Sequence, residues 1–310
     1  LLPGSRVHHS PLRRGHPMKR VWGGSSMVHP LRRAMVCAPE SAGWVDPARL
    51  DRWENLGFLH RPDSELAVRQ HIQLCQCLLR AGVELVRLPA ETSLSLDAVY
   101  THDASLVTDE GMIILRPGKS NRRVEAFHHR ALYSNLGIPI LGEIEAPGSV
   151  EGGDLLWLDA RTLVVGRSFR TNRHGLAQLG EILEPKGVRI ISAPLPYAAG
   201  PSVCLHLMSI VSLLDEETAL VDLPWLAVET VELLKERGYR FVEIDESERE
   251  TLACNVLALG DGRLLALEEN KRTNRRLEEA GFSVETFAGS EIGINGGGGP
   301  TCLTRPIERK

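Results

Sequence analysis

The chain has 310 residues, of which 43% are hydrophobic and 25% are charged, and its formal net charge is -4. This composition is typical of a globular protein with ample length for a large core. The mild acidity argues against a role on nucleic acid or on a membrane surface, because no basic patch dominates. No run is long and apolar enough to span a bilayer.

Six scattered cysteines, none in a C-x-x-C pair, give no zinc or dithiol signature. Reduced thiols in a cytoplasmic protein are therefore the expectation. Residues 1–17 are basic and rich in His, Pro and Gly, and they lack the apolar centre of a signal peptide. We expect these residues to be an N-terminal extension, disordered or foreign to the native protein, that precedes one catalytic domain at residues 18–310.

Glycine marks a repeat along the chain. Five glycines each follow a helix-like run and open a short apolar run, and they are Gly82, Gly137, Gly187, Gly238 and Gly281. Successive members are 55, 50, 51 and 43 residues apart. Glycine just past a helix end supplies the left-handed conformation that closes the helix. The apolar runs predict buried strands at residues 84–88, 138–141, 188–191, 239–244 and 283–287.

Paired apolar runs around a turn precede four of the five helices and predict β-hairpins. These hairpins cover residues 104–115, 155–165, 210–221 and 256–267. The unit is therefore strand, strand, helix, strand (ββαβ), and its period near fifty residues predicts an α/β fold of five radial units, a five-fold pseudosymmetric α/β propeller. A plain α/β sandwich with drifting repeats is the alternative.

The first unit has only one leading strand, at residues 34–37. In a closed radial array the last strand returns to complete the first unit, so we expect the segment after Cys302 to supply the missing strand. Four glycines at residues 296–299 stand just before this cysteine and let the backbone approach other groups closely. By itself the stretch suits a nucleophile on a tight loop and a flexible tail equally well.

Polar residues stand at equivalent entry positions of the units, and a radial array would bring them to one central pocket. They are Asp103, Glu151, His206, Asn255 and Cys302. A thiol, an imidazole and carboxylates together suit nucleophilic and acid–base chemistry, and carboxylates select a planar guanidinium. Each also has a structural alternative when taken singly: a turn at Glu151, a core histidine at His206 or a local cap at Asp103.

Three further segments have two interpretations each. The basic segments 118–123 and 167–173 lie between a strand and a helix of adjacent units, where their arginines either bind a substrate carboxylate or are solvated helix starts. Residues 53–63 combine Gly and Pro breaks with aromatic side chains. That segment is either a lid over the pocket or an ordinary surface loop.

With these motifs the chain, over residues 27–310, resembles the guanidino-group-modifying (pentein) superfamily of five-fold α/β propellers. The superfamily includes dimethylarginine dimethylaminohydrolases, arginine deiminases and amidinotransferases. Stretches similar to the dimethylarginine hydrolases are L-D-A-V-Y-T-H-D at 96–103, R-P-G with N-R-R at 116–123, G-R-S-F-R-T-N at 166–172 and L-H-L at 205–207. Stretches more similar to arginine deiminases and arginine dihydrolases are A-C-N at 253–255 and G-G-G-G-P-T-C at 296–302.

The resemblance implies a role for each candidate residue. Cys302 would be the nucleophile and His206 the general acid and base, with Glu151 supporting the histidine. Asp103 would hold the guanidinium, assisted by Asp97. The other implied substrate-binding residues are Arg122 and Arg170, which would take an α-carboxylate, together with His102 and Asn255.

Two departures from the family patterns leave the substrate open. His102 stands where the dimethylarginine hydrolases usually have Glu, and Met208 stands where the arginine deiminases have Asp. The resemblance implies neither a metal nor an organic cofactor. The only partner that it implies is a small guanidino substrate, and a homodimer is compatible with the sequence.

The resemblance thus implies a cysteine-dependent hydrolase of arginine or methylated arginine. A covalent thiouronium intermediate would give a ureido product plus an amine or ammonia. An amidinotransferase, in which an amine acceptor replaces water, uses the same thiol chemistry and is the alternative. A non-enzymatic ligand-binding propeller is a third interpretation, which the combination of Cys, His and Glu disfavours.

Overall fold

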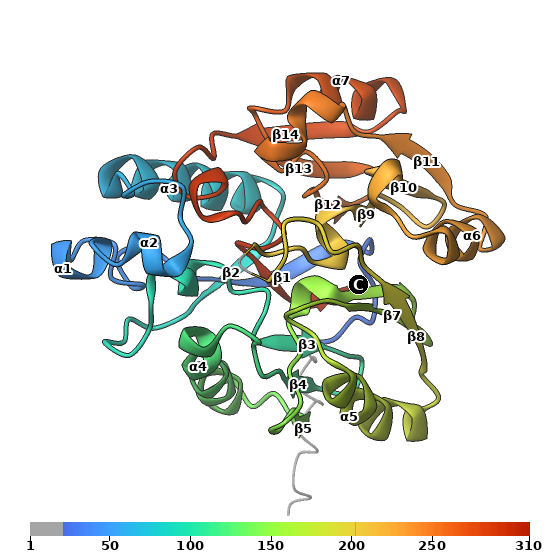
Figure 1. The fold of residues 1–310 in the computed structure, drawn as a ribbon, viewed down its shortest axis with the longest axis horizontal. Helices are drawn as coiled ribbons and strands as arrows, with labels where there is room; N and C mark the ends of the chain where they lie inside the picture. Colours follow the sequence, from blue (N-terminus) through green and yellow to red (C-terminus); the bar gives the residue numbers. More distant parts are fainter. Residues whose placement is uncertain (1–20, 202) are drawn as a thin grey trace, which may run out of the picture.

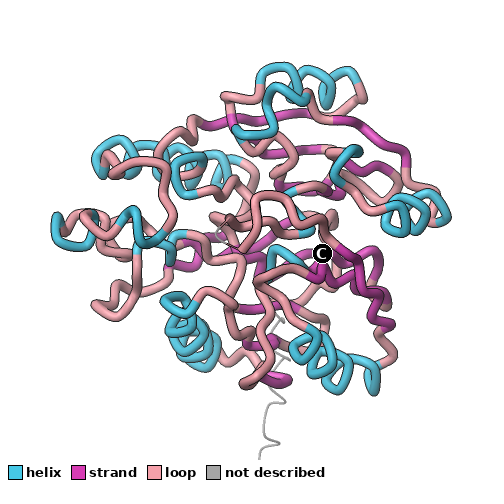
Figure 2. The backbone as a smooth tube through the Cα atoms, viewed as in Figure 1, coloured by secondary structure: helices cyan, strands magenta, loops and turns pink. Residues whose placement is uncertain are grey.

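The computed structural model describes residues 21–201 and 203–310, so the extension expected at residues 1–17 lies outside the described residues. Five three-stranded sheets surround the centre of the molecule, and the longer helices lie on the outside (Figure 1). Figure 2 shows the same arrangement as magenta strands inside a rim of cyan helices. The predicted five-fold α/β propeller is confirmed. No helix within the described ranges is both long and apolar enough to cross a membrane.

The units follow one another in chain order, and their elements are as follows. The first unit contains β1 (Leu31–Val36), the short helices α1 (Pro47–Leu50) and α2 (Trp53–Leu56), α3 (Ser64–Arg80) and β2 (Glu84–Arg87). The second contains β3 (Ser105–Val107), β4 (Met112–Ile114), α4 (Arg123–Asn135) and β5 (Ile140–Glu143). The third contains β6 (Leu155–Asp159), β7 (Thr162–Arg167), α5 (Arg173–Leu183) and β8 (Arg189–Pro194).

The last two units repeat the same order. The fourth contains β9 (Val211–Leu213), β10 (Thr218–Val221), α6 (Val228–Glu236) and β11 (Arg240–Glu243). The fifth contains β12 (Leu257–Gly260), β13 (Arg263–Leu267), α7 (Lys271–Glu279) and β14 (Ser283–Phe287), and β15 (Arg305–Arg309) ends the chain. In units two to five the first two strands pair antiparallel, and the third strand lies parallel to the middle one.

The closing strand pairs as predicted. β15 lies antiparallel to β1, with Ala34 opposite Pro306 and Met35 opposite Arg305, and β2 lies parallel to β1 on its other side. The first unit thereby obtains the strand that its own segment lacks. Because β15 begins three residues after Cys302, this pairing also ties the cysteine to the first unit.

The five repeat glycines have the predicted left-handed backbone, with φ between +67° at Gly137 and +100° at Gly281. One predicted strand starts later than expected, at Ile140 instead of Ile138. The cause is Pro139, which has no N–H to donate to a strand ladder. Its carbonyl oxygen instead accepts from the Met112 N–H at 2.8 Å.

The hydrophobic core is divided into clusters that lie between neighbouring units. The largest cluster joins the first unit to both the second and the fifth, through residues such as Met35, Ile114, Phe287 and Ile307. Further clusters connect the second unit to the third, the third to the fourth and the fourth to the fifth. Apolar packing therefore holds the ring together on every side.

Shortening a buried side chain of the closing strand is expected to destabilise the whole ring. Ile307 is fully buried in β15, so Ile307→Ala should lower the free energy of unfolding by about 2–5 kcal/mol. The exposed Leu59 is the control, because Leu59→Ala should change it by less than about 0.5 kcal/mol. Chemical denaturation measures both variants, and equal stabilities would contradict the structural role of β15.

Candidate active site

Cys302 is mostly buried near the centre of the ring, and Asn255 holds it. The Asn255 amide Nδ2 donates to Cys302 Sγ at 3.0 Å, while its Oδ1 accepts from the Thr301 N–H at 3.0 Å. The Cys302 carbonyl oxygen accepts from the His102 N–H at 3.1 Å. The thiol is therefore positioned from both the fifth and the second units.

The glycine run is tightly packed, which excludes the flexible tail. A Cβ on Gly298 would lie 2.5 Å from the Tyr100 ring and 2.9 Å from Cys302 Cβ. A Cβ on Gly299 would lie 2.7 Å from Asn255 Oδ1. Any larger residue at these two positions would displace the groups that surround the thiol.

His206 and Glu151 form a buried pair between the fourth and third units. His206 Nε2 donates to Glu151 Oε2 at 2.7 Å, and Glu151 has no exposed surface. Its second oxygen accepts from the Lys119 N–H at 3.2 Å and lies 3.4 Å from Arg170 Nη1. A Cβ on Gly153 would lie 2.2 Å from His206 Nδ1, so glycine is required where this loop passes the ring.

Charges around the pair control its protonation. Burial opposes a charge on His206, but its interactions with Cys204, Asp154 and Asp103 outweigh burial and raise the pKa of His206 well above its usual range. Burial also opposes the charge of Glu151, whose pKa is nevertheless lowered by the hydrogen bond and charge of His206. The pair is therefore an imidazolium and a carboxylate at neutral pH.

Burial, followed by the charge of Asp103, raises the pKa of Cys302 to about 11. His206 and the Asn255 hydrogen bond act in the opposite direction. At neutral pH the resting cysteine is consequently a thiol that lies near a charged imidazolium. A cation bound beside the sulfur would lower the pKa of Cys302, because it stabilises the thiolate.

Asp103 lies fully inside the protein with one oxygen on each of two donors. Its Oδ2 accepts from Arg122 Nη1 at 2.5 Å, and its Oδ1 accepts from the Gly153 N–H at 2.9 Å. Burial opposes ionisation, yet the charges of Arg122 and His206 hold the pKa of Asp103 well below its usual range. Asp103 is thus a permanent anion next to the site.

Arg122 is buried among carboxylates of the protein. Its side chain is only 5% exposed and binds both Asp103 and Glu125, with Glu125 at 2.8 and 2.9 Å. Nη2 also donates to the Tyr100 carbonyl oxygen at 2.7 Å. The two buried carboxylates need this cation, and the expected contact of Arg122 with a substrate carboxylate stays a prediction.

Asp97 and His102 likewise have protein partners. Asp97 binds Lys119 Nζ at 2.8 Å and the Asn121 amide at 2.7 Å. His102 Nδ1 donates to the Thr304 carbonyl oxygen at 2.9 Å, and burial, followed by the charge of Arg305, lowers the pKa of His102 to about 3. His102 is therefore a neutral, 2% exposed side chain, and its expected contact with substrate stays a prediction.

The two departures from the family patterns meet in space. His102 and Met208 both line one internal cavity of about 10 Å³, which has room for roughly one water. Neither residue lines the larger cavities that open to solvent.

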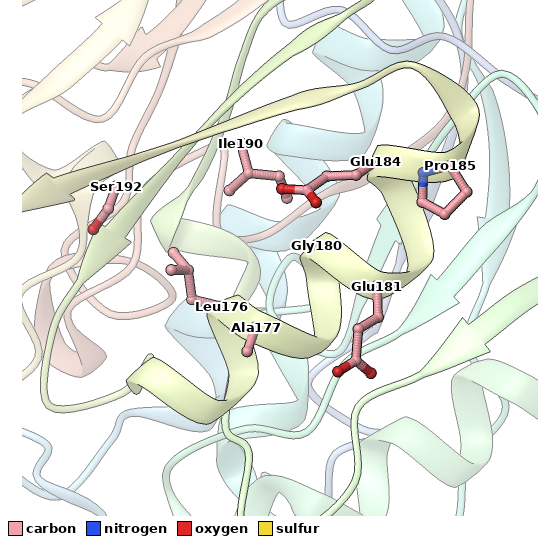
Figure 3. Close-up of a pocket in the computed structure, with 8 residues that line it drawn as sticks. All are labelled: Leu176, Ala177, Gly180, Glu181, Glu184, Pro185, Ile190 and Ser192. Carbon is pink, nitrogen blue, oxygen red and sulfur yellow. The ribbon is translucent and has the colours of Figure 1, made fainter.

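Arg170 is the predicted arginine that remains available. Its side chain is 14% exposed, and it forms an ion pair of 3.4 Å with Glu151. It lines a cavity of about 310 Å³ together with Arg167, Phe169, Tyr197, Val203 and Leu205. A cavity of about 460 Å³ between α5 and β8 (Figure 3) contains none of the predicted site residues.

Several positioning residues were missed by the sequence reasoning. Asp154 accepts from the Leu207 N–H at 2.9 Å and from Ser168 Oγ at 2.6 Å, which fixes the chain next to His206. Thr171 Oγ1 accepts from the Glu151 N–H at 3.1 Å. Asp154 belongs to the E-G-G-D segment at 151–154, and Thr171 belongs to the R-T-N segment at 170–172. The sequence alone does not indicate which backbone group a polar side chain will bind.

Residues 53–63 are attached to the segment before the glycine run. The N–H groups of Leu59 and His60 donate to the Asn295 carbonyl and side-chain oxygens at 2.9 and 3.0 Å. The Asp63 N–H donates to Glu291 Oε2 at 3.1 Å. This segment is therefore held against the residues that precede the glycine run. The movement expected of a lid stays a prediction.

Comparison with known proteins identifies the same superfamily that the sequence motifs resemble. The sequence model of the arginine deiminase family matches residues 92–224 and 216–309. A dimethylarginine dimethylaminohydrolase of Streptomyces coelicolor is 31% identical over 220 residues, which cover 71% of this chain and 78% of that protein.

Solved structures agree. The dimethylarginine dimethylaminohydrolase of Pseudomonas aeruginosa in complex with citrulline has a TM-score of 0.72 at 25% identity, covering 90% of this chain and 100% of that one. An amidinotransferase of saxitoxin biosynthesis from Microseira wollei has a TM-score of 0.75 at 18% identity, covering 93% and 97%, and shares the fold.

The fold and the matches place this protein in the class of guanidino-group-modifying propeller enzymes, the penteins. Within that class, the chain belongs to the arginine deiminase family. The family-level resemblance read from the motifs is confirmed.

Replacing each of the two arginines is predicted to lower stability by a different amount. Arg122→Gln should lower the free energy of unfolding by about 3–5 kcal/mol, because it leaves Asp103 and Glu125 buried without a cation. Arg170→Gln is the matched control and should cost less than about 1 kcal/mol, since its single contact is long and partly exposed. Equal unfolding midpoints in a denaturant titration would refute the structural role of Arg122.

Proposed function

We propose that this protein is a cysteine-dependent hydrolase of guanidino compounds of the arginine or methylated-arginine type. The observation that carries the proposal is a thiol, Cys302, held by Asn255 close enough to the buried His206–Glu151 pair for the imidazolium to lower its pKa. Such a combination supports a nucleophile next to a proton donor. The dimethylarginine hydrolase and arginine deiminase relatives agree with it.

The first step is capture of the cationic guanidinium. Oδ2 of Asp103 accepts from Arg122 and Oδ1 from the Gly153 N–H, and a carboxylate oxygen has a second lone pair, which suits a planar guanidinium N–H donor. The bound cation lowers the pKa of Cys302 and favours loss of its proton to solvent. Arg170, beside the 310 Å³ cavity, is the residue that we propose for a substrate carboxylate.

The second step forms the covalent intermediate. The Cys302 thiolate attacks the central guanidinium carbon, which makes a C–S bond and a tetrahedral adduct. The His206 imidazolium gives its proton to the departing nitrogen, and the C–N bond breaks to release an amine or ammonia. The product is an S-alkylthiouronium on Cys302, while Glu151 holds the now neutral imidazole in place.

The third step is hydrolysis. The neutral His206 takes a proton from water as the water oxygen attacks the thiouronium carbon. The proton of the new hydroxyl group then passes to the sulfur as the C–S bond breaks, which regenerates the Cys302 thiol and releases a ureido product. The imidazolium is restored at the same time, so the cycle ends with its starting charges.

The test is a turnover screen of arginine, mono- and dimethylarginine and shorter guanidino acids. Ammonia, alkylamine and ureido product are measured separately, and Cys302→Ser should abolish turnover while the protein still unfolds at the same temperature. Near-normal activity in this variant would falsify the mechanism. Transfer of the amidino group to glycine or lysine, with no ureido product, would instead establish the amidinotransferase.

The raised pKa of Cys302 predicts a distinctive pH profile. Between about pH 6 and 9 the thiolate fraction rises about tenfold per unit, because the pH stays below the thiol pKa, while His206 stays protonated. We therefore expect kcat/KM to increase with pH through this range. Asn255→Ala removes a hydrogen bond that lowers the pKa of Cys302, so its profile should move to higher pH. A flat wild-type profile would contradict this assignment.

A further inference from the structure

We propose that the cavity beside Arg170 is a subsite for an apolar acyl group, and that the preferred substrate is an arginine acylated on its α-nitrogen. This inference rests on the function proposed above, because it names the substrate of the same site. The cavity measures about 310 Å³, a size typical of small-molecule sites. Its lining includes apolar and aromatic side chains next to two arginines: Phe169, Tyr197, Val203, Leu205, Arg167 and Arg170.

Three apolar side chains around this cavity are exposed to solvent. Phe169 is 55% exposed, Tyr197 is 70% exposed and Val203 is 51% exposed. The two rings meet edge to face, with their centroids 5.7 Å apart. Single exposed apolar residues are ordinary, but three gathered around one cavity next to polar groups are typical of a binding site.

The loops that carry the two rings are held by local contacts. Ser168 Oγ accepts from the Arg170 N–H at 3.0 Å, which fixes the turn that contains Phe169. The Gly200 N–H donates to the Tyr197 carbonyl oxygen at 2.9 Å and closes a second turn. Gly200 has a φ of +83°, and a Cβ there would lie 2.8 Å from the Tyr197 hydroxyl. The rings are therefore placed by the backbone beneath them.

Arg170 connects the cavity to the acid–base pair. Its side chain lines the cavity and also lies 3.4 Å from Glu151, the partner of His206. Leu205, which directly precedes His206, lines the same cavity. A substrate whose carboxylate binds Arg170 thus has the catalytic pair on one side and an apolar space on the other.

The charge of the lining selects an acylated α-nitrogen. Among the described residues the lining contains Arg167 and Arg170 and no carboxylate. A free α-ammonium group next to the bound carboxylate would lie near these two cations, which repel it. An amide at the same nitrogen has no charge, and its acyl group can enter the apolar part of the cavity. The guanidinium end of the molecule remains free to reach Asp103 and Cys302.

Binding is measured first, by calorimetry on the Cys302→Ser protein, so that no ligand is consumed. The ligands are Nα-acetylarginine and Nα-benzoylarginine, which both lack the α-ammonium charge and differ in the apolar surface of the acyl group. We expect benzoylarginine to bind at least about tenfold more tightly, because burial of roughly 60 Å² of apolar surface accounts for such a factor. Equal affinities would overturn the subsite.

Variants of the rings locate the acyl group. Phe169→Ala and Tyr197→Ala should each lower the ratio of benzoylarginine to acetylarginine affinity by at least about threefold, because each removes part of the aromatic wall. Phe127→Ala is the matched control, since Phe127 is 68% exposed on α4 and lies outside the lining. The control should keep the ratio. A ratio that no ring variant changes would place the acyl group elsewhere and contradict the proposal.

The carboxylate contact is tested with Nα-benzoylargininamide, which keeps the acyl group and the guanidinium but has no carboxylate. Its affinity for the Cys302→Ser protein should be at least about tenfold lower than that of benzoylarginine, because the charge-assisted hydrogen bond to Arg170 is lost. Equal affinity of the acid and the amide would rule out Arg170 as the carboxylate anchor and, with it, the orientation proposed here.

Turnover is measured last, with Cys302 intact. We expect kcat/KM for benzoylarginine to exceed those for acetylarginine and for free arginine by at least about tenfold, with an acylated ureido compound as the product. A higher kcat/KM for free arginine would overturn the proposed substrate class and leave the proposed function intact. Failure of the proposed function is different: no guanidine would be turned over, while the binding titrations would still decide whether the subsite exists.

Discussion

The return of the last strand to the first unit is the constraint on which the rest of the structure depends. β15 supplies the missing edge of the β1 sheet, and the core cluster around Ile307 joins the first unit to the second and the fifth. The chain must therefore cross the centre of the ring just before β15, and Cys302 lies on that crossing. Asn255 and the glycines then determine the position of the sulfur. Closure of the fold therefore also positions Cys302, the proposed nucleophile.

Buried charge is the second theme of the centre. Asp103, Glu125 and Glu151 are almost inaccessible to water, and burial disfavours the charged form of each. Arg122 compensates the first two and His206 the third. Even so, burial raises the pKa of Glu125 to about 7. A network in this state favours an incoming cation, because each carboxylate is only partly neutralised by its protein partner.

The segments R-T-N at 170–172 and E-G-G-D at 151–154 each combine residues of the proposed site with residues that support it. In R-T-N, Arg170 faces the cavity, Thr171 holds the Glu151 backbone, and Asn172 Oδ1 caps α5 by accepting from the Gly175 N–H. In E-G-G-D, Glu151 binds His206, and Asp154 holds the following unit through Leu207. E-G-G-D thus joins the third unit to the fourth, whereas R-T-N holds the site loop of the third unit to its own helix.

The sequence by itself determined the repeat, the closing strand and the set of polar entry residues. Glycine caps and alternating apolar runs are local signals, and each survives in the structure with shifts of about two residues, as at Pro139. Only the tertiary structure decided the partners of those polar residues. Arg122 turned inward to Asp103 and Glu125, His102 joined Met208 at a small cavity, and Cys204 came to lie beside His206 and Glu151. The reason is physical: periodicity records which face of an element is buried, whereas the partner of a buried charge depends on distances between units that no local pattern contains.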